Sequence, residues 1–453
     1  MRYFTLVSIL FFFILSAFLI IKYIIADTGI SFAYDYFLNK LELNSTRNIV
    51  SIKYNIHEFE KSNDQIFKFE DIQGFGKKLI KKNDNQYKPS PDQLDDTDEW
   101  IRSNGGDFSN KYSIFNQINK NNINNLKLEL KIDLNNKILK KNWMNNVETN
   151  PIFYDGLLYV VTPFREVLAI DIENQIIKWR FKSLKKIDSR GITLWINKKN
   201  KENSCLFVPI RNGIFCINYK TGKLNNKLGD NGFIKTGIVK AAPVIWKNNV
   251  VVATVNDQKV KIISLFDGIV TDVINIHPKN RKFKGGSPWG GISLDKKNNL
   301  LFLTTGNPRP ALIGTSRPGK NKNANSVIAI DLNQKKILWT FQEVAHDLWD
   351  YDIASPPLLA KVKINDNLID VVIITTKIGN TFIFDRYSGV SLHDINYINV
   401  PKSDFINEKV SPKQILNLIP EAFMKLNLSI DDFDNRLIED KNKIINNINE
   451  FNF

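Results

Sequence analysis

The segment LLYVVTPFREVLAIDIENQIIKWRF (157–181) decides the fold expected for this chain. It contains an apolar run, a turn, a second apolar run that ends in Asp171, a polar turn, and a third run that carries Trp179. Short apolar runs separated by turn residues are typical of β-strands, and the period of an amphipathic helix is absent. The segment therefore predicts three consecutive strands.

Four further segments repeat this pattern, at 205–224, 250–270, 300–341 and 371–390. The corresponding polar residues are Asp171, Asn218, Ser264, Asp331 and Asp385, which are 47, 46, 67 and 54 positions apart. In the first and fourth copies a tryptophan, Trp179 or Trp339, follows the aspartate by eight positions. Several short strands per repeat at this spacing are typical of β-propeller blades. The sequence thus predicts an all-β propeller in which these tryptophans pack between neighbouring blades.

The flanks of the repeats are less regular. KLELKIDL (127–134) predicts a lone strand before the first unit, and the chain after about 400 has the pattern of loops and helix with no further blade. We therefore expect about five units, together with a leading strand whose partners are not visible in the sequence.

The N-terminus carries a long apolar run. Residues 3–21, YFTLVSILFFFILSAFLII, hold no charge, and about 20 helical residues cross a bilayer. The run is longer than the apolar region of a signal peptide, and Ile24 and Ala26 make a poor cleavage pair. We expect an uncleaved transmembrane helix within residues 1–26, with a cleaved signal as the alternative. A linker over 27–96 and a propeller over 97–453 would follow, and either form of the N-terminus would export them.

Composition excludes several classes of protein. The chain has 453 residues, two cysteines and four histidines, which argues against a zinc-ribbon framework or a His-rich metal site. Its formal net charge is +15, but the lysines are spread along the chain rather than clustered beside aromatic residues, so we expect no nucleic-acid partner. Cys205 and Cys216 lie on two predicted strands joined by a turn with Asn212-Gly213, and either a disulfide or two buried thiols fits this placement.

Three motifs interrupt the blade pattern. In FQEVAHDLWDYDIASPPLL (341–359), Asp347, Asp350 and Asp352 surround Trp349. Such carboxylates suit a hard cation or a general base, although a solvated turn would give the same pattern. GGSPWGGISLD (285–295) places Trp289 among glycines, where the backbone can approach a flat ligand, and TTGNP (304–308) places Asn307 at a strand end.

Together these motifs resemble the quinoprotein dehydrogenases, the alcohol and glucose dehydrogenases that depend on pyrroloquinoline quinone (PQQ). The resemblance extends from about residue 97 and includes GGDFSNKYSIFNQINKNNINNLKLE (105–129), SRGITLW (189–195) and PWGGISLDKKNNLLFLTTGNP (288–308). It is closer to the membrane glucose dehydrogenase branch. It implies an eight-bladed propeller that oxidises a sugar or alcohol hydroxyl and passes electrons to a membrane quinone. It also implies a location in the periplasm, held to the bacterial inner membrane by the single N-terminal helix.

The resemblance also implies roles for individual residues. Asp350 would be the general base on the substrate hydroxyl, and Lys377 would lie beside the quinone oxygens as the second catalytic residue. Trp289 would stack on PQQ. Arg190 and Lys377 would contact the cofactor, as would Glu148 with a weaker match.

The same resemblance implies a metal site for Ca²⁺ or Mg²⁺. Asn307 and Asp350 would be ligands, with Asp257 in VNDQ as the third. The alternatives are that Trp289 is a core residue, Lys377 a surface residue and Asp257 a turn residue.

This chain departs from the family in two respects. Phe164 stands where some glucose dehydrogenases carry a histidine, and members of the family continue well beyond the blades visible here. A fragment, a split gene with a separate chain supplying the missing blades, or a decayed copy would fit, and we expect this chain alone to be inactive or unstable. The competing class is a non-catalytic propeller scaffold, such as outer-membrane assembly lipoproteins, which lack the GNP and WDYD motifs present here and need an N-terminal lipobox cysteine that is absent.

Overall fold

The computed structural model describes residues 100–112, 117–132, 148–163, 165–184, 187, 190–364, 367–400, 402–403 and 405–416. The predicted membrane helix within 1–26 and the linker over 27–96 lie outside these residues. Among the described residues, no helix is long and apolar enough to cross a bilayer.

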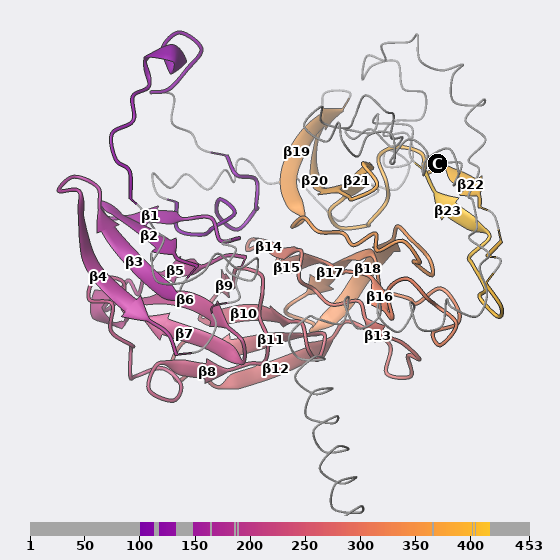
Figure 1. The fold of residues 1–453 in the computed structure, drawn as a ribbon, viewed down its shortest axis with the longest axis horizontal. Helices are drawn as coiled ribbons and strands as arrows, with labels where there is room; N and C mark the ends of the chain where they lie inside the picture. The colour runs from indigo at the N-terminus through magenta and orange to yellow at the C-terminus, as the bar shows by residue number, and fades with distance from the viewer. Residues whose placement is uncertain are drawn as a thin grey trace, which may run out of the picture. The chain divides into compact units, whose positions relative to one another are not determined.

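The described residues form five main antiparallel sheets, each built from strands consecutive in the chain (Figure 1). The first two contain β1 (Ile152–Tyr154), β2 (Leu157–Val161), β3 (Glu166–Asp171) and β4 (Ile176–Lys182), then β5 (Thr193–Trp195), β6 (Cys205–Ile210), β7 (Gly213–Ile217) and β8 (Phe233–Lys235). The third contains β9 (Val244–Trp246), β10 (Asn249–Thr254), β11 (Lys259–Ser264) and β12 (Val270–Asn275). The fourth and fifth contain β14 (Gly291–Asp295), β15 (Leu300–Thr304), β17 (Ser326–Asp331) and β18 (Lys336–Gln342), then β19 (Leu358–Ile364), β20 (Asn367–Thr375) and β21 (Thr381–Asp385).

Short elements lie outside these sheets. Two two-stranded ribbons pair β13 (Lys284–Gly285) with β16 (Pro308–Arg309) and β22 (Tyr397–Asn399) with β23 (Lys413–Ile415). Single 3₁₀ turns occur at η4 (Ile123–Asn125) and η6 (Lys201–Asn203).

The polar residue of each repeat marks the end of the third strand of its sheet. Asp171, Asp331 and Asp385 are the last residues of β3, β17 and β21. Their carboxylates accept backbone N–H groups two or three positions ahead, as in the 2.9 Å bond from Gln334 to Asp331. Aspartate at a strand end thus closes the turn that follows, which explains why the repeat could be recognised from these positions.

The middle strands are buried on both faces, which explains their uninterrupted apolar runs. On β6, Leu206 and Val208 pack towards the first sheet, whereas Phe207 and its neighbour Cys205 pack towards the third. Because successive side chains of a strand point to opposite faces, each middle strand contributes to two cores. The fourth strands, such as β4, alternate between exposed and partly buried residues and form the outer edge.

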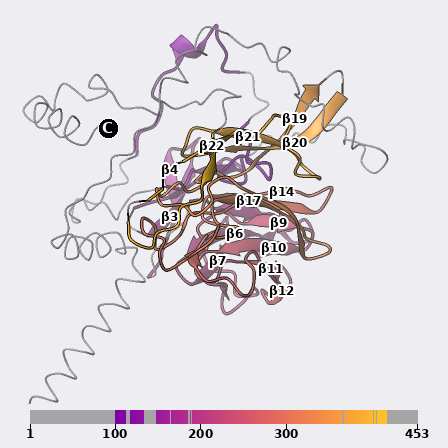
Figure 2. The same ribbon diagram turned by 90° about the vertical axis from the view of Figure 1, so that its right-hand side faces the viewer.

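Among the residues that the structure describes, four hydrophobic clusters each lie between two sheets that follow one another in the chain, and a fifth lies on the fifth sheet alone. One cluster joins the first and second sheets, another the second and third, another the third and fourth, and another the fourth and fifth. Figure 2 shows β9 to β12 from the side, with β14 and β17 next to them. This face-to-face stacking in chain order confirms the propeller-like fold; the total of eight blades stays a prediction.

Trp179 and Trp339 each bind a neighbouring sheet, as the sequence predicted for the tryptophans of the first and fourth units. The indole Nε1 of Trp179 on β4 donates to the carbonyl of Tyr219 at 2.9 Å, and that of Trp339 on β18 donates to the carbonyl of Arg386 at 3.1 Å. In each case the backbone of a glycine, Gly222 or Gly389, contacts the indole so closely that a Cβ atom there would overlap the ring. The two tryptophans therefore serve packing between blades.

The segment 100–108 contacts the first strand of every main sheet or the residues next to it. Its backbone hydrogen bonds reach Phe153, Leu194, Leu294 and Leu359. The Arg102 side chain, 1% exposed, donates to the carbonyls of Pro243 (2.9 Å), Ala242 (2.9 Å) and Ile292 (2.7 Å). This segment thus connects the inner strands of five sheets, including sheets that are far apart in sequence.

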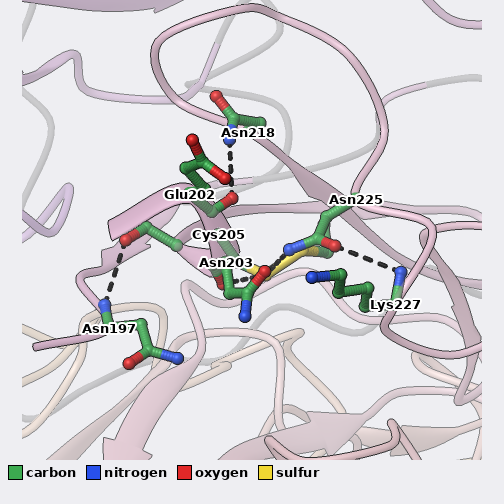
Figure 3. Close-up of a disulfide and its surroundings, with 9 residues drawn as sticks. Asn197, Glu202, Asn203, Cys205, Asn218, Asn225 and Lys227 are labelled. Atoms are coloured by element: carbon green, nitrogen blue, oxygen red, sulfur yellow. Dashed lines mark hydrogen bonds between the residues drawn. A yellow bond between two sulfur atoms is a disulfide. The ribbon is translucent and has the colours of Figure 1, made fainter. Parts of the chain in front are cut away.

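Cys205 and Cys216 form a disulfide between β6 and β7, with 4.9 Å between their Cα atoms (Figure 3). Both cysteines are fully buried in the core between the second and third sheets. At the nearby surface, the amide of Asn218 donates to the carbonyl of Glu202 at 2.8 Å. Of the two alternatives that the sequence left open, the structure therefore supports the disulfide.

Two local predictions are wrong. Residues 127–132 of the predicted leading strand form no strand and are largely exposed, because no neighbouring strand pairs with them; residues 133–134 lie outside the described set. Residues 413–415, in the tail expected as loop and helix, instead pair with residues 397–399 as the β22–β23 ribbon, and Ile415 is buried against the fifth sheet. Tertiary packing decides the conformation of both segments.

Candidate active site

Four loops at strand ends bring the candidate site together. They are the residues before β14 that carry Trp289, the residues after β15 that carry Asn307, the loop 343–357 between β18 and β19, and the turn 376–380 between β20 and β21. Loops held by strands of different sheets can converge while their scaffold stays rigid, which is a common arrangement for binding sites.

Asp347 organises the loop that presents Asp350. Its buried carboxylate accepts the backbone N–H groups of Trp349 and Tyr351 and the side-chain amide of Asn325, each at 2.8 Å. Burial raises the pKa of this carboxyl, although the three donors oppose the shift. Asp347 therefore acts as a structural brace for the loop that presents Asp350.

Asp350 adopts an unusual backbone conformation. Its φ is +63°, in the left-handed region that residues other than glycine seldom adopt. Such backbone strain is often found at functional positions, where the surrounding structure maintains it. Here the braced loop 347–352 maintains it and turns the half-exposed Asp350 carboxylate towards Asn307.

Asp350, Asn307 and Lys377 are in direct contact. The side-chain amide of Asn307 touches the Asp350 carboxylate, and the ammonium of Lys377 lies 2.8 Å from the Asp350 carbonyl and 3.4 Å from its carboxylate. The sequence placed these three residues in one site, and the structure brings them together from three different loops.

Asp352 connects the members of the site. One carboxylate oxygen accepts the Trp289 indole N–H at 3.0 Å and the backbone N–H of Asn307 at 2.9 Å, and the other accepts the Lys377 ammonium at 3.0 Å. Gly306 lies so close to Asp352 and Trp289 that a Cβ atom there would overlap both. The sequence singled out Asp352 within the aspartate run but gave it no role, because its contacts arise only when the loops meet.

The Lys377 side chain is partly buried between two carboxylates. Partial burial by itself would lower its pKa, but the hydrogen bond and charge of Asp352, together with the charge of Asp350, outweigh that effect and raise it. Lys377 is therefore a cation throughout the neutral range.

Arg190 and Glu148 extend the site on the other side of Trp289. The Arg190 guanidinium lies over the Trp289 indole, 4.5 Å from the ring centroid, in the geometry of a cation–π contact. Its Nε is 3.0 Å from the Glu148 carboxylate, close enough for an ion pair but not aligned as a hydrogen bond. Six of the seven predicted residues thus form a continuous chain of contacts.

Asp257 has different surroundings. It lies in the turn between β10 and β11, where its carboxylate accepts the Thr254 hydroxyl and lies 2.9 Å from the Lys261 ammonium. Within the described part of the chain, its contacts do not include Asn307 or Asp350. Its role as a metal ligand stays a prediction.

The described ranges contain no group of three or more His, Cys, Asp or Glu side chains arranged to hold a metal ion. The metal-ligand roles of Asn307 and Asp350 are likewise predictions; in the structure the Asn307 side-chain amide donates to the Asp350 carboxylate.

The tail holds the Asp350 loop from outside. The ring of His346 lies 2.7 Å from the Glu408 carboxylate, and the Gln414 side chain both accepts from and donates to the backbone of Ala345. Segment 405–416 therefore braces the start of the loop that carries Asp347 and Asp350.

Comparison with known proteins identifies the family of this chain. The family model described as "PQQ: Glucose/ethanol/alcohol dehydrogenase, beta-propeller domain" matches residues 100–273 and 266–453. The chain belongs to this family. The match covers every loop of the candidate site.

Curated relatives are similar over most of this chain. The quinoprotein glucose dehydrogenase A of Acinetobacter calcoaceticus is 27% identical over 378 residues, which cover 69% of this chain and 47% of the relative. The quinoprotein glucose dehydrogenase of Escherichia coli (strain K12) is 24% identical, with 70% and 46% covered, and the quinohemoprotein alcohol dehydrogenase of Comamonas testosteroni is 24% identical, with 64% and 45% covered. The chain thus spans about half the length of the curated relatives it matches.

Solved structures share the fold. A europium-containing methanol dehydrogenase superposes with a TM-score of 0.54 at 19% identity, covering 65% of this chain and 57% of that one. The quinohemoprotein alcohol dehydrogenase from Comamonas testosteroni gives 0.52 at 21% identity, with 67% and 48% covered. At these identities the likeness concerns the fold.

Proposed function

We propose that this chain forms the propeller part of a PQQ-dependent dehydrogenase that oxidises a hydroxyl group of a sugar or an alcohol. The observation that carries the proposal is the group formed by Asp350, Asn307 and Lys377 beside the Trp289 indole. A carboxylate in contact with an amide and an ammonium, next to a flat aromatic ring, can serve both a quinone cofactor and a proton transfer.

The residues present fit PQQ, which is a flat quinone with three carboxylates. Trp289 offers an aromatic face, and the Arg190 guanidinium lies over its ring. The Lys377 ammonium binds Asp352, which also accepts the Trp289 indole N–H. Arginine is well suited to bind a carboxylate through two parallel hydrogen bonds. Because Arg190 now rests on the indole, a ligand stacking on that face would displace it towards the ligand's own carboxylates.

The residues also fit a hard cation. Asp350 supplies carboxylate oxygens and Asn307 an amide oxygen, which are the donors that Ca²⁺ and Mg²⁺ prefer. We propose these two residues as metal ligands, with Asp257 as the predicted third.

In the proposed reaction, PQQ with its divalent cation supplies the two-electron acceptor. Asp350 accepts the proton of the substrate hydroxyl, since its half-exposed carboxylate is open to a ligand. Lys377 remains protonated and holds Asp350 and Asp352 through its ammonium, so that the base keeps its orientation. Asn307 is fixed by its backbone bond to Asp352 and orients its side chain towards Asp350.

The wider setting is proposed on other grounds. The buried disulfide supports an exported protein, because disulfides persist mainly in oxidising compartments. Together with the apolar N-terminal run, this supports a periplasmic propeller on a single-pass anchor in the inner membrane, with a membrane quinone as electron acceptor. The chain spans about half the length of the curated relatives it matches, so the activity of the whole protein is itself part of this proposal.

The test measures cofactor binding and turnover separately. The purified full chain is titrated with PQQ in the presence of Ca²⁺ or Mg²⁺ while tryptophan fluorescence is followed, and dye-linked oxidation of a panel of sugars and alcohols is assayed. We expect saturable quenching that Trp289→Ala abolishes and that the matched variant Trp195→Ala retains. Absence of PQQ binding with either metal would contradict the proposal, whereas robust turnover by the monomer would remove the need for further blades.

A further inference from the structure

Glu343 is a buried carboxyl that the proposed reaction does not use. It follows the last residue of β18 and is 2% exposed. One of its carboxylate oxygens, Oε1, accepts two hydrogen bonds, from the Thr376 hydroxyl and from the Asn380 side-chain amide, both at 2.8 Å. Thr376 and Asn380 are the two ends of the turn that carries Lys377.

The turn is closed by backbone bonds of its own and belongs to the fifth sheet. Thr376 N–H donates to the Asn380 carbonyl and Gly379 N–H donates to the Thr376 carbonyl, both at 3.1 Å. The strands β20 and β21 pair on either side of it. The two bonds to Glu343 attach it to the fourth sheet, where the loop of Asp350 begins.

Glu343 is itself anchored to the residues around the site. Its backbone N–H donates to the Asn325 carbonyl at 2.9 Å, and the Asn325 N–H donates to the Gly306 carbonyl at 2.9 Å. The Asn325 side chain donates to the Asp347 carboxylate and to the Tyr351 carbonyl. Glu343 thus joins the segment of Asn307, the loop of Asp350 and the turn of Lys377.

We propose that Glu343 is a positioning residue that keeps the Lys377 ammonium on the carboxylates of Asp350 and Asp352. The catalytic importance of this role rests on the proposed function. The contact of Lys377 with Asp350 and Asp352, however, exists in the protein without cofactor. Lys377 has a long, flexible side chain, so the placement of its ammonium depends on where its turn is held.

The chemical state of Glu343 is compatible with this role. Burial raises its pKa to about 7, and the charge of Asp347 adds to the shift, while the bonds from Asn380 and Thr376 oppose it. Among the described residues, its second oxygen, Oε2, has no hydrogen-bond partner. Since Oε1 accepts both bonds whether the group is neutral or ionised, positioning of the turn needs an acceptor rather than a charge.

The test compares variants that keep the acceptor with variants that remove it. Glu343→Gln retains a side-chain oxygen, Glu343→Leu removes it at similar volume, and Thr376→Val removes one donor from the opposite side. Thr375→Val is the matched control, because the neighbouring Thr375 is exposed and contacts Ser355 instead.

The first measurement is the rate at which an amine-acylating reagent labels Lys377 in the cofactor-free protein, read by peptide mass spectrometry against the exposed Lys297. The Lys377 side chain is 38% exposed, so the reagent can reach it, while the two carboxylates keep it protonated and slow to react. We expect Glu343→Leu and Thr376→Val to increase the labelling rate at least threefold. Glu343→Gln and Thr375→Val should stay within twofold of wild type.

The second measurement is PQQ affinity by fluorescence, with kcat and KM where turnover is found. Loss of positioning should weaken PQQ binding and lower kcat more than it raises KM, with rescue in Glu343→Gln. Unchanged labelling of Lys377 in a folded Glu343→Leu protein would overturn the proposal. If that variant does not fold, unchanged labelling in Thr376→Val overturns it, and failure of PQQ binding in wild type would bear on the proposed function alone.

Discussion

Arg102 and Lys377 are both cations that tie distant segments of the chain together, but they differ in burial and in the groups they bind. Arg102 is 1% exposed and donates to main-chain carbonyls of two sheets, whereas the Lys377 side chain is 38% exposed and binds two carboxylates. Backbone carbonyls do not titrate, and they cannot move unless the strands that carry them move as well. The half-exposed Asp350 carboxylate, by contrast, can exchange its protein partner for a ligand. The same kind of charge therefore stabilises the fold in one region and prepares a site in the other.

The largest effect should come from the site. We expect Asp350→Asn to lower kcat by about 10²- to 10⁴-fold, because the amide cannot accept the hydroxyl proton. Turnover is measured by dye-linked oxidation in whichever preparation is active, the chain alone or with further blades. Asp331→Asn, which changes a turn aspartate of the fourth sheet, is the control and should stay within twofold. A retained rate above a tenth of wild type would exclude Asp350 as the base.

The next largest effect should be the loss of stability on removal of the Arg102 side chain. Arg102→Leu should lower the free energy of unfolding by about 3–5 kcal/mol, since it strands several buried carbonyls that an ionised donor had satisfied. Urea denaturation followed by circular dichroism measures the loss. Arg165→Leu, at an exposed arginine, should change stability by less than about 0.5 kcal/mol. Equal losses in the two variants would mean that Arg102 does not connect the sheets energetically.

Removal of the disulfide should weaken the fold and leave the site intact. The bridge closes a loop of 11 positions, for which chain entropy gives a stabilisation of about 3 kcal/mol. Urea denaturation of Cys205→Ala/Cys216→Ala against wild type measures this difference. PQQ affinity of the folded variant should match wild type, and a large change in affinity would show that the second sheet also shapes the site.

The smallest effect concerns the pH dependence of stability. The pKa of Glu343 is about 7 in the folded protein against 4.5 for an unperturbed glutamate, so the folded protein binds this proton more tightly. The resulting stabilisation is complete below pH 4.5 and is lost as the pH rises to about 7. Relative to Glu343→Gln, wild type should therefore lose on the order of 2 kcal/mol between pH 5 and 8. Parallel stability curves for the two proteins would show that this carboxyl does not titrate as described.

The fold could be predicted from the sequence because its signals are local. Asp171, Asp331 and Asp385 close turns with neighbours two or three positions away, and Trp179 and Trp339 keep a fixed distance from their aspartates. The segment 127–134 carried the same kind of apolar pattern but was wrongly predicted as a strand. A strand needs a partner, and its own residues do not reveal whether one exists.

The site could be predicted in part because family motifs mark Trp289, Asn307, Asp350 and Lys377. Asp352 and Glu343 had no assigned role, since their importance lies in contacts between loops that are distant in the chain. In the sequence, Glu343 in particular cannot be distinguished from any other polar residue that follows a strand. Only the packing of the fourth sheet against the fifth shows that it binds both ends of the Lys377 turn.

The reach of segment 100–108 has a consequence for how the protein is made. This segment leaves the ribosome before any of the five sheets, yet its last backbone bond, which the Leu359 N–H donates to the Phe108 carbonyl, needs the fifth. Its early contacts, to Phe153 and Leu194, can form as soon as the first and second sheets are synthesised. Contacts between residues far apart in sequence form slowly. The contacts of this segment therefore cannot be complete before the fifth sheet, which also carries the turn of Lys377, has been synthesised.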